Sequence, residues 1–127
     1  MRVLVCGGRE YDDWSAFSEG MWKVMKDLGL DNQDYFEGDA SKKITIIHGN
    51  AKGADFMARI WTKLWGCTEQ RYDANWSLHG KSAGPIRNAL MIEEGQPDVV
   101  ISFPGSSGTA HMVSIARKKG VKVIEIT

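Results

Sequence analysis

Short apolar runs alternate along the chain with longer segments whose apolar residues recur every three or four positions. The first pattern is typical of buried strands and the second of amphipathic helices. Five strands are predicted, of which the third is the weakest, at residues 2–6, 44–47, 67–72, 98–103 and 121–126. Four helices are predicted between them: the first ends at Gly29, the second ends at Gly66, the third begins at Pro85 and the fourth ends at Gly120.

This alternation predicts an α/β fold, a Rossmann-like doubly wound parallel sheet of about five strands with helices on both faces. Right-handed crossovers leave few topologies, and we favour the strand order 3-2-1-4-5. The 127 residues are expected to form one domain, 1–127.

Apolar spacing also predicts which helix faces point inward. The third helix is expected to bury Ile86, Ala89 and Leu90, and the fourth is expected to bury Met112, Val113 and Ala116. Two polar segments, residues 31–43 and 73–84, are expected to be surface loops, and the second is long enough to act as a lid.

A glycine-containing loop follows three of the predicted strands, at residues 7–10, 48–55 and 104–109. In the order 3-2-1-4-5 the first and fourth strands are neighbours, so the 7–10 and 104–109 loops are expected to face each other, with the 48–55 loop alongside. A glycine loop that opens a helix leaves backbone N–H groups unpaired at the positive end of the helix dipole, where a phosphate binds well. The alternative is an ordinary turn in which Ser or Thr caps the helix.

Two arginines are candidate anion contacts. Arg9 follows the first strand and could clamp a phosphate or instead pair with Glu10 or Asp12. Arg87 is predicted in the first turn of its helix, where the dipole disfavours a cation, and this favours a ligand role. An ion pair of Arg87 with Glu93 or Asp98 is the alternative.

Other polar residues have two interpretations each. His48 is either a ligand contact or a structural histidine, and Asp55 either caps its helix or binds a ribose hydroxyl. His111 is expected on the helix surface, and Trp76 is the tryptophan placed to stack on a base. The predicted ligand- and phosphate-binding residues are Gly7, Gly8, Arg9, His48, Gly49, Gly53, Asp55, Arg87, Asn88, Pro104, Gly105, Ser106, Ser107, Gly108 and Thr109.

Composition restricts the classes of partner. Sixteen basic and sixteen acidic residues cancel, which argues against bulk electrostatic binding of nucleic acid or of an anionic membrane. No apolar run approaches the ~18–20 residues of a membrane span, and no signal peptide precedes the first strand, so a cytoplasmic location is expected. Cys6 and Cys67 are predicted to be buried free thiols. No His or Cys spacing fits a transition metal, so no metal site and no cofactor are assigned, although magnesium is compatible as a companion of a phosphate ligand.

Four motifs follow one another along nearly the whole chain: Gly7-Gly8-Arg9, His48-Gly49-x-Ala51-x-Gly53-Ala54-Asp55, Ala83-Gly84-Pro85-Ile86-Arg87-Asn88-x-x-Met91 and Phe103-Pro104-Gly105-x-x-Gly108-Thr109-Ala110. Together they resemble the YspA/YpsA-related branch of the SLOG superfamily, and the match runs nearly end to end. The resemblance implies a Rossmann-like fold that binds nucleotides or nucleotide derivatives, such as ADP-ribose-type molecules, in bacteria and phages.

The sequence is also similar to the LOG family, whose members are phosphoribohydrolases that cleave the N-glycosidic bond of nucleoside monophosphates. Their loop reads Pro-Gly-Gly-x-Gly-Thr-x-x-Glu; here Ser106 replaces the second glycine and Met112 stands at the position of the catalytic glutamate. Arg87 resembles the arginine of the helix that precedes that loop. A thioether can neither accept a proton nor stabilise an oxocarbenium-like centre, as a carboxylate does. The resemblance therefore supports phosphate binding more than glycosidic cleavage. LOG enzymes are dimers, which favours a homodimer here.

Three functions follow as hypotheses. The first is a domain that binds a nucleotide-type small molecule, as a sensor or a sponge for a signalling nucleotide. The alternative is a nucleotide-processing hydrolase in which Asp55, Glu10 or Glu93 replaces the missing glutamate, with Arg87 as a further candidate catalytic group. The third, an accessory role in nucleic-acid processing, is disfavoured by the neutral charge balance.

Overall fold

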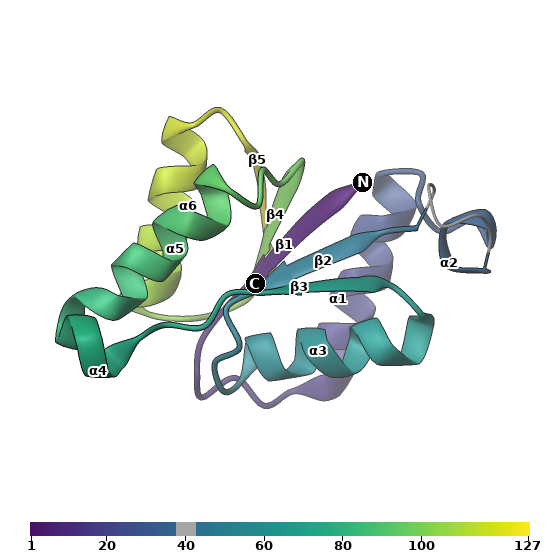
Figure 1. The fold of residues 1–127 in the computed structure, drawn as a ribbon. Coiled ribbons are helices and arrows are strands. Elements are labelled where there is room, and N and C mark those ends of the chain that lie inside the picture. Colours follow the sequence, from purple (N-terminus) through teal and green to yellow (C-terminus); the bar gives the residue numbers. More distant parts are fainter. Residues whose placement is uncertain (38–42) are drawn as a thin grey trace.

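The fold is built on one parallel five-stranded sheet, shown in a computed structural model that describes residues 1–37 and 43–127. The spatial order of the strands is β3-β2-β1-β4-β5, which confirms the predicted topology (Figure 1). In chain order they are β1 (Arg2–Cys6), β2 (Thr45–His48), β3 (Thr68–Arg71), β4 (Val99–Ser102) and β5 (Lys122–Glu125).

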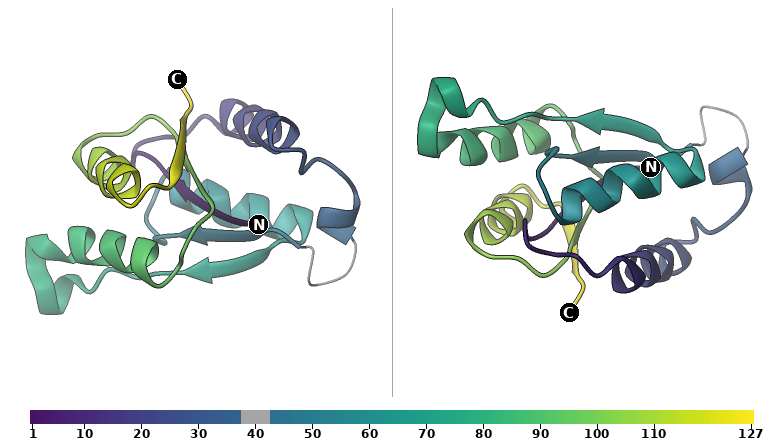
Figure 2. Two further views of the ribbon diagram at one scale, coloured as in Figure 1. Left: turned by 90° about the horizontal axis from the view of Figure 1, so that it is seen from above. Right: turned by 90° about the horizontal axis from the view of Figure 1, so that it is seen from below.

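Helices cover both faces of this sheet, as predicted for a doubly wound fold (Figures 1 and 2). α1 (Trp14–Asp27) and α3 (Ala54–Trp65) lie on one face, and α5 (Ala83–Glu93) and α6 (Ser107–Lys118) lie on the other. The shorter elements are α2 (Asp34–Glu37), α4 (Trp76–His79) and the 3₁₀ turn η2 (Gly80–Ser82).

Alternation along the central strand β1 explains how one strand serves two cores. Val3 and Val5 belong to the cluster under α1 and α3, while Leu4 and Cys6 belong to the cluster under α5 and α6. Successive side chains of a strand point to opposite faces, so a strand covered on both sides must be apolar throughout. The register pairs Cys6 with Ser102 of β4, which brings the loops that follow these two strands together.

The segment that connects β3 to α5 differs from the predicted loop at residues 73–84. Residues 76–84 are helical: α4 begins after Asn75, whose side chain accepts a hydrogen bond from the Leu78 N–H at 3.0 Å, and η2 leads directly into α5. Asn is a strong N-cap, so this start was readable from the sequence. α5 consequently begins at Ala83, two residues before Pro85, and Arg87 is its fifth residue and lies outside the first turn.

The predicted inward face of α5 is also wrong. Ile86 and Leu90 are about two-fifths exposed, at 38% and 41%, and Ala89 is exposed as well. The buried residues of the helix are Ala83, Gly84, Asn88, Met91 and Ile92. By contrast, the predicted inward residues of α6, Met112, Val113 and Ala116, are all buried.

The segment predicted as a surface loop at residues 31–43 contains the short helix α2. Its Phe36 ring lies 5.2 Å from the ring centroid of Trp22 and 6.1 Å from that of the fully buried Trp61. This aromatic cluster extends the core beyond the end of the sheet. Residues 38–42 lie outside the described part of the chain.

Candidate functional site

Three loops meet at the carboxyl edge of the sheet. The Gly8 N–H donates a 2.8 Å hydrogen bond to the Pro104 carbonyl, and the Ala54 N–H donates one of 3.2 Å to the Gly8 carbonyl. The 7–10 loop therefore lies between the 104–109 and 48–55 loops, which confirms the predicted convergence. Ligands of open α/β sheets bind at this position, outside the ends of neighbouring strands whose connections diverge.

Two glycines make this close approach possible. A Cβ atom at Gly8 would lie 2.9 Å from the Pro104 carbonyl oxygen, closer than real contacts allow. Gly53 has a φ of +76°, and its Cβ would overlap the carbonyl oxygen of Gly8. Side chains at either position would push the loops apart, so packing explains Gly8, and packing together with the positive φ explains Gly53.

A cleft of about 940 Å³ opens between the loops and the helices α5 and α6. This volume is near the upper end of the ~300–1,000 Å³ typical of small-molecule sites. Thirteen of the fifteen predicted ligand contacts line it, namely Gly7, Gly8, Arg9, Gly49, Asp55, Arg87, Asn88, Pro104, Gly105, Ser106, Ser107, Gly108 and Thr109. His48 and Gly53 are not among the lining residues.

The N-terminus of α6 forms one wall of the cleft and has no side-chain cap. The alternative interpretation of this loop, in which Ser or Thr caps the helix, is therefore not found. Within the described chain, no acceptor bonds the N–H groups of the first three residues of the helix, Ser107, Gly108 and Thr109. A Cβ atom at Gly108 would meet nothing within 4 Å, so neither packing nor backbone conformation requires this glycine. The result is three free donors and open space at the positive end of a helix dipole.

Arg87 reaches across the cleft from α5. Its Nη1 donates a 2.6 Å hydrogen bond to the Gly49 carbonyl, and its Nε donates one of 3.1 Å to the Asn88 side chain. The expected alternative, an ion pair with Glu93 or Asp98, does not form: Glu93 pairs with Lys119, and Asp98 accepts from the Arg2 N–H. Burial lowers the pKa of Arg87; the negative charge of Asp55 opposes this shift and the positive charge of Arg9 adds to it.

Asn88 continues this polar network to α6. Its Nδ2 lies 3.2 Å from the Gly108 carbonyl and 3.2 Å from Nδ1 of His111. His111 is half-buried and lines the cleft, so its predicted place on the helix surface is wrong. The spacing contained a signal, since His111 stands three residues after Gly108 and therefore on the same side of the helix.

Asp55 is the one buried acid among the residues that line the cleft. It is 7% exposed, lies in the first turn of α3, and accepts a 3.2 Å hydrogen bond from the Ala51 N–H. Burial raises the pKa of Asp55, and the hydrogen bond from Ala51 and the charges of Arg87 and His48 oppose the rise. A carboxyl group balanced in this way can bind a hydroxyl or carry a proton.

Arg9 and Trp76 meet at the mouth of the cleft. The guanidinium carbon of Arg9 lies 5.0 Å from the centroid of the Trp76 ring, a cation–π distance. Among the described residues, Arg9 forms none of the ion pairs expected with Glu10 or Asp12. Both side chains are exposed and both line the cleft.

The floor of the cleft is apolar. Met91 and Met112 are 2% and 1% exposed, and they pack beside Cys6 in the core cluster under α5 and α6. Burial raises the pKa of the Cys6 thiol to about 12, so this group is neutral. Sequence patterns gave no reason to include Met91 or Cys6, because strand and helix periodicity assign both to the core.

Three of the predicted functional residues do not line the cleft, namely His48, Gly53 and Glu93. His48 is fully buried, its Nδ1 accepts a 3.0 Å hydrogen bond from the Asn50 N–H, and its Nε2 is 3.5 Å from a Glu69 carboxylate oxygen without forming a hydrogen bond. It therefore shapes the 48–55 loop from beneath. Glu93 is exposed, 3.3 Å from Lys119, and outside the cleft lining, while Glu10 lies at the exposed rim.

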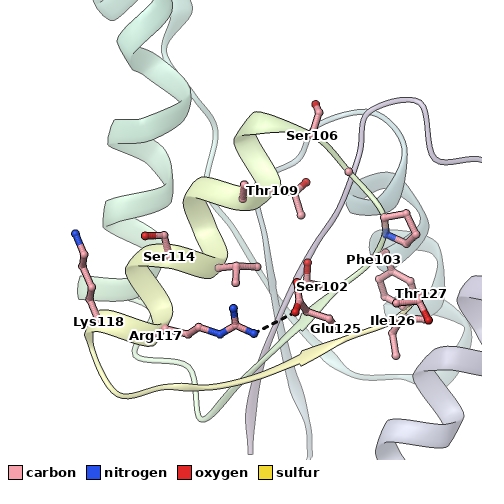
Figure 3. Close-up of a pocket in the computed structure, with 14 residues that line it drawn as sticks. Ser102, Phe103, Ser106, Thr109, Ser114, Arg117, Lys118, Glu125, Ile126 and Thr127 are labelled. Carbon is pink, nitrogen blue, oxygen red and sulfur yellow. Dashed lines mark hydrogen bonds and ion pairs between the residues drawn. The ribbon is translucent and has the colours of Figure 1, made fainter.

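A second cavity, of about 880 Å³, lies on the other side of the 104–106 segment, along α6 and beside β5 (Figure 3). One end carries the exposed ion pair between Arg117 and Glu125, at 3.1 Å. Of the predicted site residues it contains Pro104, Gly105, Ser106 and Thr109. It lacks the two cleft arginines, so we place the candidate site in the first cavity.

Neither a metal cluster nor a membrane-spanning helix is found in the part of the chain that the structure describes. No three His, Cys, Asp or Glu side chains of residues 1–37 and 43–127 are grouped so that they could hold a metal ion. No helix in these ranges combines the length and the apolar character needed to cross a bilayer. Cys6 and Cys67 are both free, the first buried and the second partly buried.

Comparison with known proteins agrees with the geometry of the fold. The family model described as "YspA, cpYpsA-related SLOG family" matches residues 1–79. A relative, the Gene 61 protein of Mycobacterium phage D29, is 33% identical over 132 aligned positions, which cover 97% of this chain and 94% of the phage protein.

Proposed function

This chain belongs to the YspA, cpYpsA-related SLOG family, and we propose that it binds a nucleotide or nucleotide derivative in the cleft between its glycine loops. The phosphate would lie against the N-terminus of α6, with Arg9 and Arg87 as its charge partners and Asp55 near the ribose. The protein would act as a sensor or a sponge for that molecule.

The uncapped first turn of α6 carries this proposal. Three N–H groups without acceptors face a cleft, and Gly108 keeps the space before them empty at a position where the fold would accept a side chain. Ser107 and Gly108 are exposed and Thr109 is half-buried, and free donors at a helix N-terminus that line a cavity favour an anionic ligand. A phosphate supplies several strong acceptor oxygens at once.

The charge of the cleft supports the same ligand class. Its charged lining residues are three basic side chains, Arg9, Lys81 and Arg87, against two acidic ones, Glu10 and Asp55. The whole chain is neutral, so this local excess is a property of the site. An apolar floor beneath a cationic rim suits a molecule with an anionic end and a less polar body.

Calorimetry with purified protein tests the proposal, using AMP, ADP-ribose, NAD and cyclic dinucleotides as titrants. Circular dichroism and a cooperative thermal transition would establish that the sample is folded. At least one titrant is expected to bind with one site per chain. Absence of binding across the panel by a folded protein contradicts the proposal.

Hydrolysis of the same ligand is the second candidate function, and Asp55 is the observation that favours it. A buried carboxyl group with a raised pKa beside an arginine resembles the general acids and bases of many active sites. Chromatography of AMP or ADP-ribose after long incubation at high protein concentration separates the two functions. Intact nucleotide leaves binding as the function, whereas products that disappear in Asp55→Asn would identify turnover.

A further inference from the structure

We infer that Trp76 is a stacking platform for the base of the ligand, and that Arg9 covers this platform until a base replaces it. This inference rests on the proposed function and specifies it. The ligand class becomes base-bearing nucleotides, and sugar phosphates without a base are excluded as the preferred ligands.

The position of Trp76 is set by its short helix and by a glycine. Asn75 caps α4 through the 3.0 Å hydrogen bond from the Leu78 N–H, which fixes the first turn. A Cβ atom at Gly84 would lie 3.4 Å from Cη2 of the Trp76 ring, so the ring packs over the start of α5. An indole is thereby held at the cleft although 48% of its surface is exposed.

Trp76 is the most exposed of the five tryptophans, and it is the one that lines the cleft. Burial of a large aromatic surface strongly favours binding. An exposed indole that lines a cavity leaves this surface available to a ligand. Flat aromatic faces are the common means by which proteins bind unpaired bases, because every base has a π-face.

Arg9 lies over the face of the Trp76 ring. Its guanidinium carbon is 5.0 Å from the ring centroid, and no carboxylate of the described residues pairs with it. At an exposed site a cation–π contact of this kind is weak compared with base–aromatic stacking. A base can therefore displace the guanidinium from the ring with a net gain in binding free energy.

The displaced guanidinium has a second role close by. Arg9 lines the same cleft as the 104–109 loop, and its charge is near enough to Arg87 to shift the protonation equilibrium of that side chain. Two cations this close repel each other until an anion lies between them. A nucleotide would act on Arg9 in two ways: its base would replace the guanidinium on Trp76, and its phosphate would neutralise the charge of the displaced guanidinium.

Paired ligands and paired variants test this inference. Wild type, Trp76→Ala, Trp76→Phe, Arg9→Met and Leu78→Ala are titrated calorimetrically with AMP and ADP-ribose, and with ribose 5-phosphate as the probe without a base. Leu78 is on the same helix as Trp76, is 71% exposed and does not line the cleft, so it is the matched control.

Wild type is expected to bind a base-bearing probe more tightly than ribose 5-phosphate. Trp76→Ala should weaken binding of that probe by about 5- to 150-fold, the range that base–aromatic stacking supplies, and leave ribose 5-phosphate within about twofold. Trp76→Phe should keep most of the discrimination, and Leu78→Ala all of it. Arg9→Met should weaken ribose 5-phosphate more than the base-bearing probe, because it removes a phosphate partner of both but also removes the guanidinium that a base must displace from Trp76. Equal weakening of both classes by Arg9→Met would contradict the covering role of Arg9.

Two results overturn the inference while leaving the proposed function intact. One is a Trp76→Ala protein that is folded by circular dichroism and binds base-bearing probes as tightly as wild type. The other is equal weakening of all probes by Trp76→Ala, which would make the residue a support of the loops. If folded wild type binds no probe, the proposed function and this inference fail together.

Discussion

Nη1 of Arg87 lies 2.6 Å from the carbonyl oxygen of Gly49 and donates a hydrogen bond to it, so a helix on one face of the sheet is tied to the loop that follows β2. The two residues are 38 positions apart. A Cβ atom at Gly49 would overlap the guanidinium, so the glycine makes room for the arginine. This contact holds Arg87 over the cleft and beside Asp55.

Arg87→Met should destabilise the fold by about 1.5–3 kcal/mol, the typical contribution of a hydrogen bond to a charged group. The variant loses the bond to Gly49 and leaves the Asp55 carboxylate without its nearby cation. Urea unfolding followed by circular dichroism measures the change. Arg117→Met is the control, because Arg117 is exposed and its ion pair with Glu125 is expected to contribute less than about 1 kcal/mol. Equal effects of the two variants would contradict the role given to Arg87.

Gly108→Asp should abolish nucleotide binding without destabilising the protein. The position has open space at its Cβ, and a carboxylate in the first turn of α6 favours the helix by about 0.3–1 kcal/mol. The same carboxylate would occupy the free N–H groups and repel a phosphate. Thermal melting and calorimetry measure the two effects separately. Ser114→Asp places the same charge on the exposed side of the same helix and should leave affinity unchanged; wild-type affinity in Gly108→Asp would place the phosphate elsewhere.

Asp55 should make the protein less stable as the pH rises above about 4. Its pKa in the folded state is raised above the ordinary value of 3.8 by burial, so the folded chain holds a proton that the unfolded chain releases first. The stabilising effect is present in full below pH 3.8 and is lost as the pH passes through the raised pKa. The difference in free energy of unfolding between wild type and Asp55→Asn, measured from pH 3.5 to 8, should therefore fall with pH. A difference that increases with pH would show that Arg87 and the Ala51 N–H stabilise the carboxylate more than burial destabilises it.

Both thiols of the native protein should react slowly with a disulfide reagent at pH 8. Burial raises the pKa of Cys6 to about 12 and that of Cys67 to about 11, so little of either is thiolate at this pH. Cys6, which is 8% exposed, should react at least about tenfold more slowly than Cys67, because a pKa of about 12 against about 11 leaves about one tenth as much thiolate. In urea, which unfolds the chain, two thiols per chain should react quickly with the reagent, since the chain has two cysteines. Rapid modification of Cys6 in the native protein would show that the floor of the cleft opens.

The convergence of the three loops could be predicted because it depends on strand order and on backbone rules. Strands β1 and β4 are recognisable in the sequence as apolar runs, and they are neighbours in the order that we favour among the few topologies that right-handed crossovers leave. Once the order is known, the loops after Cys6 and Ser102 must share an edge.

The orientation of α5 could not be predicted from apolar spacing, because its buried face contains a polar residue that other elements satisfy. Asn88 is 7% exposed, and its amide is bonded by Gly108 and His111 of α6. Without the position of α6, the spacing of Ile86 and Leu90 is a stronger indication of the buried face than Asn88 is, and it predicts the wrong face. The predicted place of Arg87 in the first turn of its helix is wrong, and yet its side chain lines the cleft.

The 104–106 segment borders both cavities, so the two share a wall made of backbone. Gly8 is hydrogen-bonded to this wall through Pro104, whereas the Ser106 side chain forms no cap that would anchor it to α6. A ligand that displaces the segment in one cavity must reshape the other. A molecule that fills the cavity beside Arg117 and Glu125 would therefore contact the same backbone segment that a ligand in the cleft contacts.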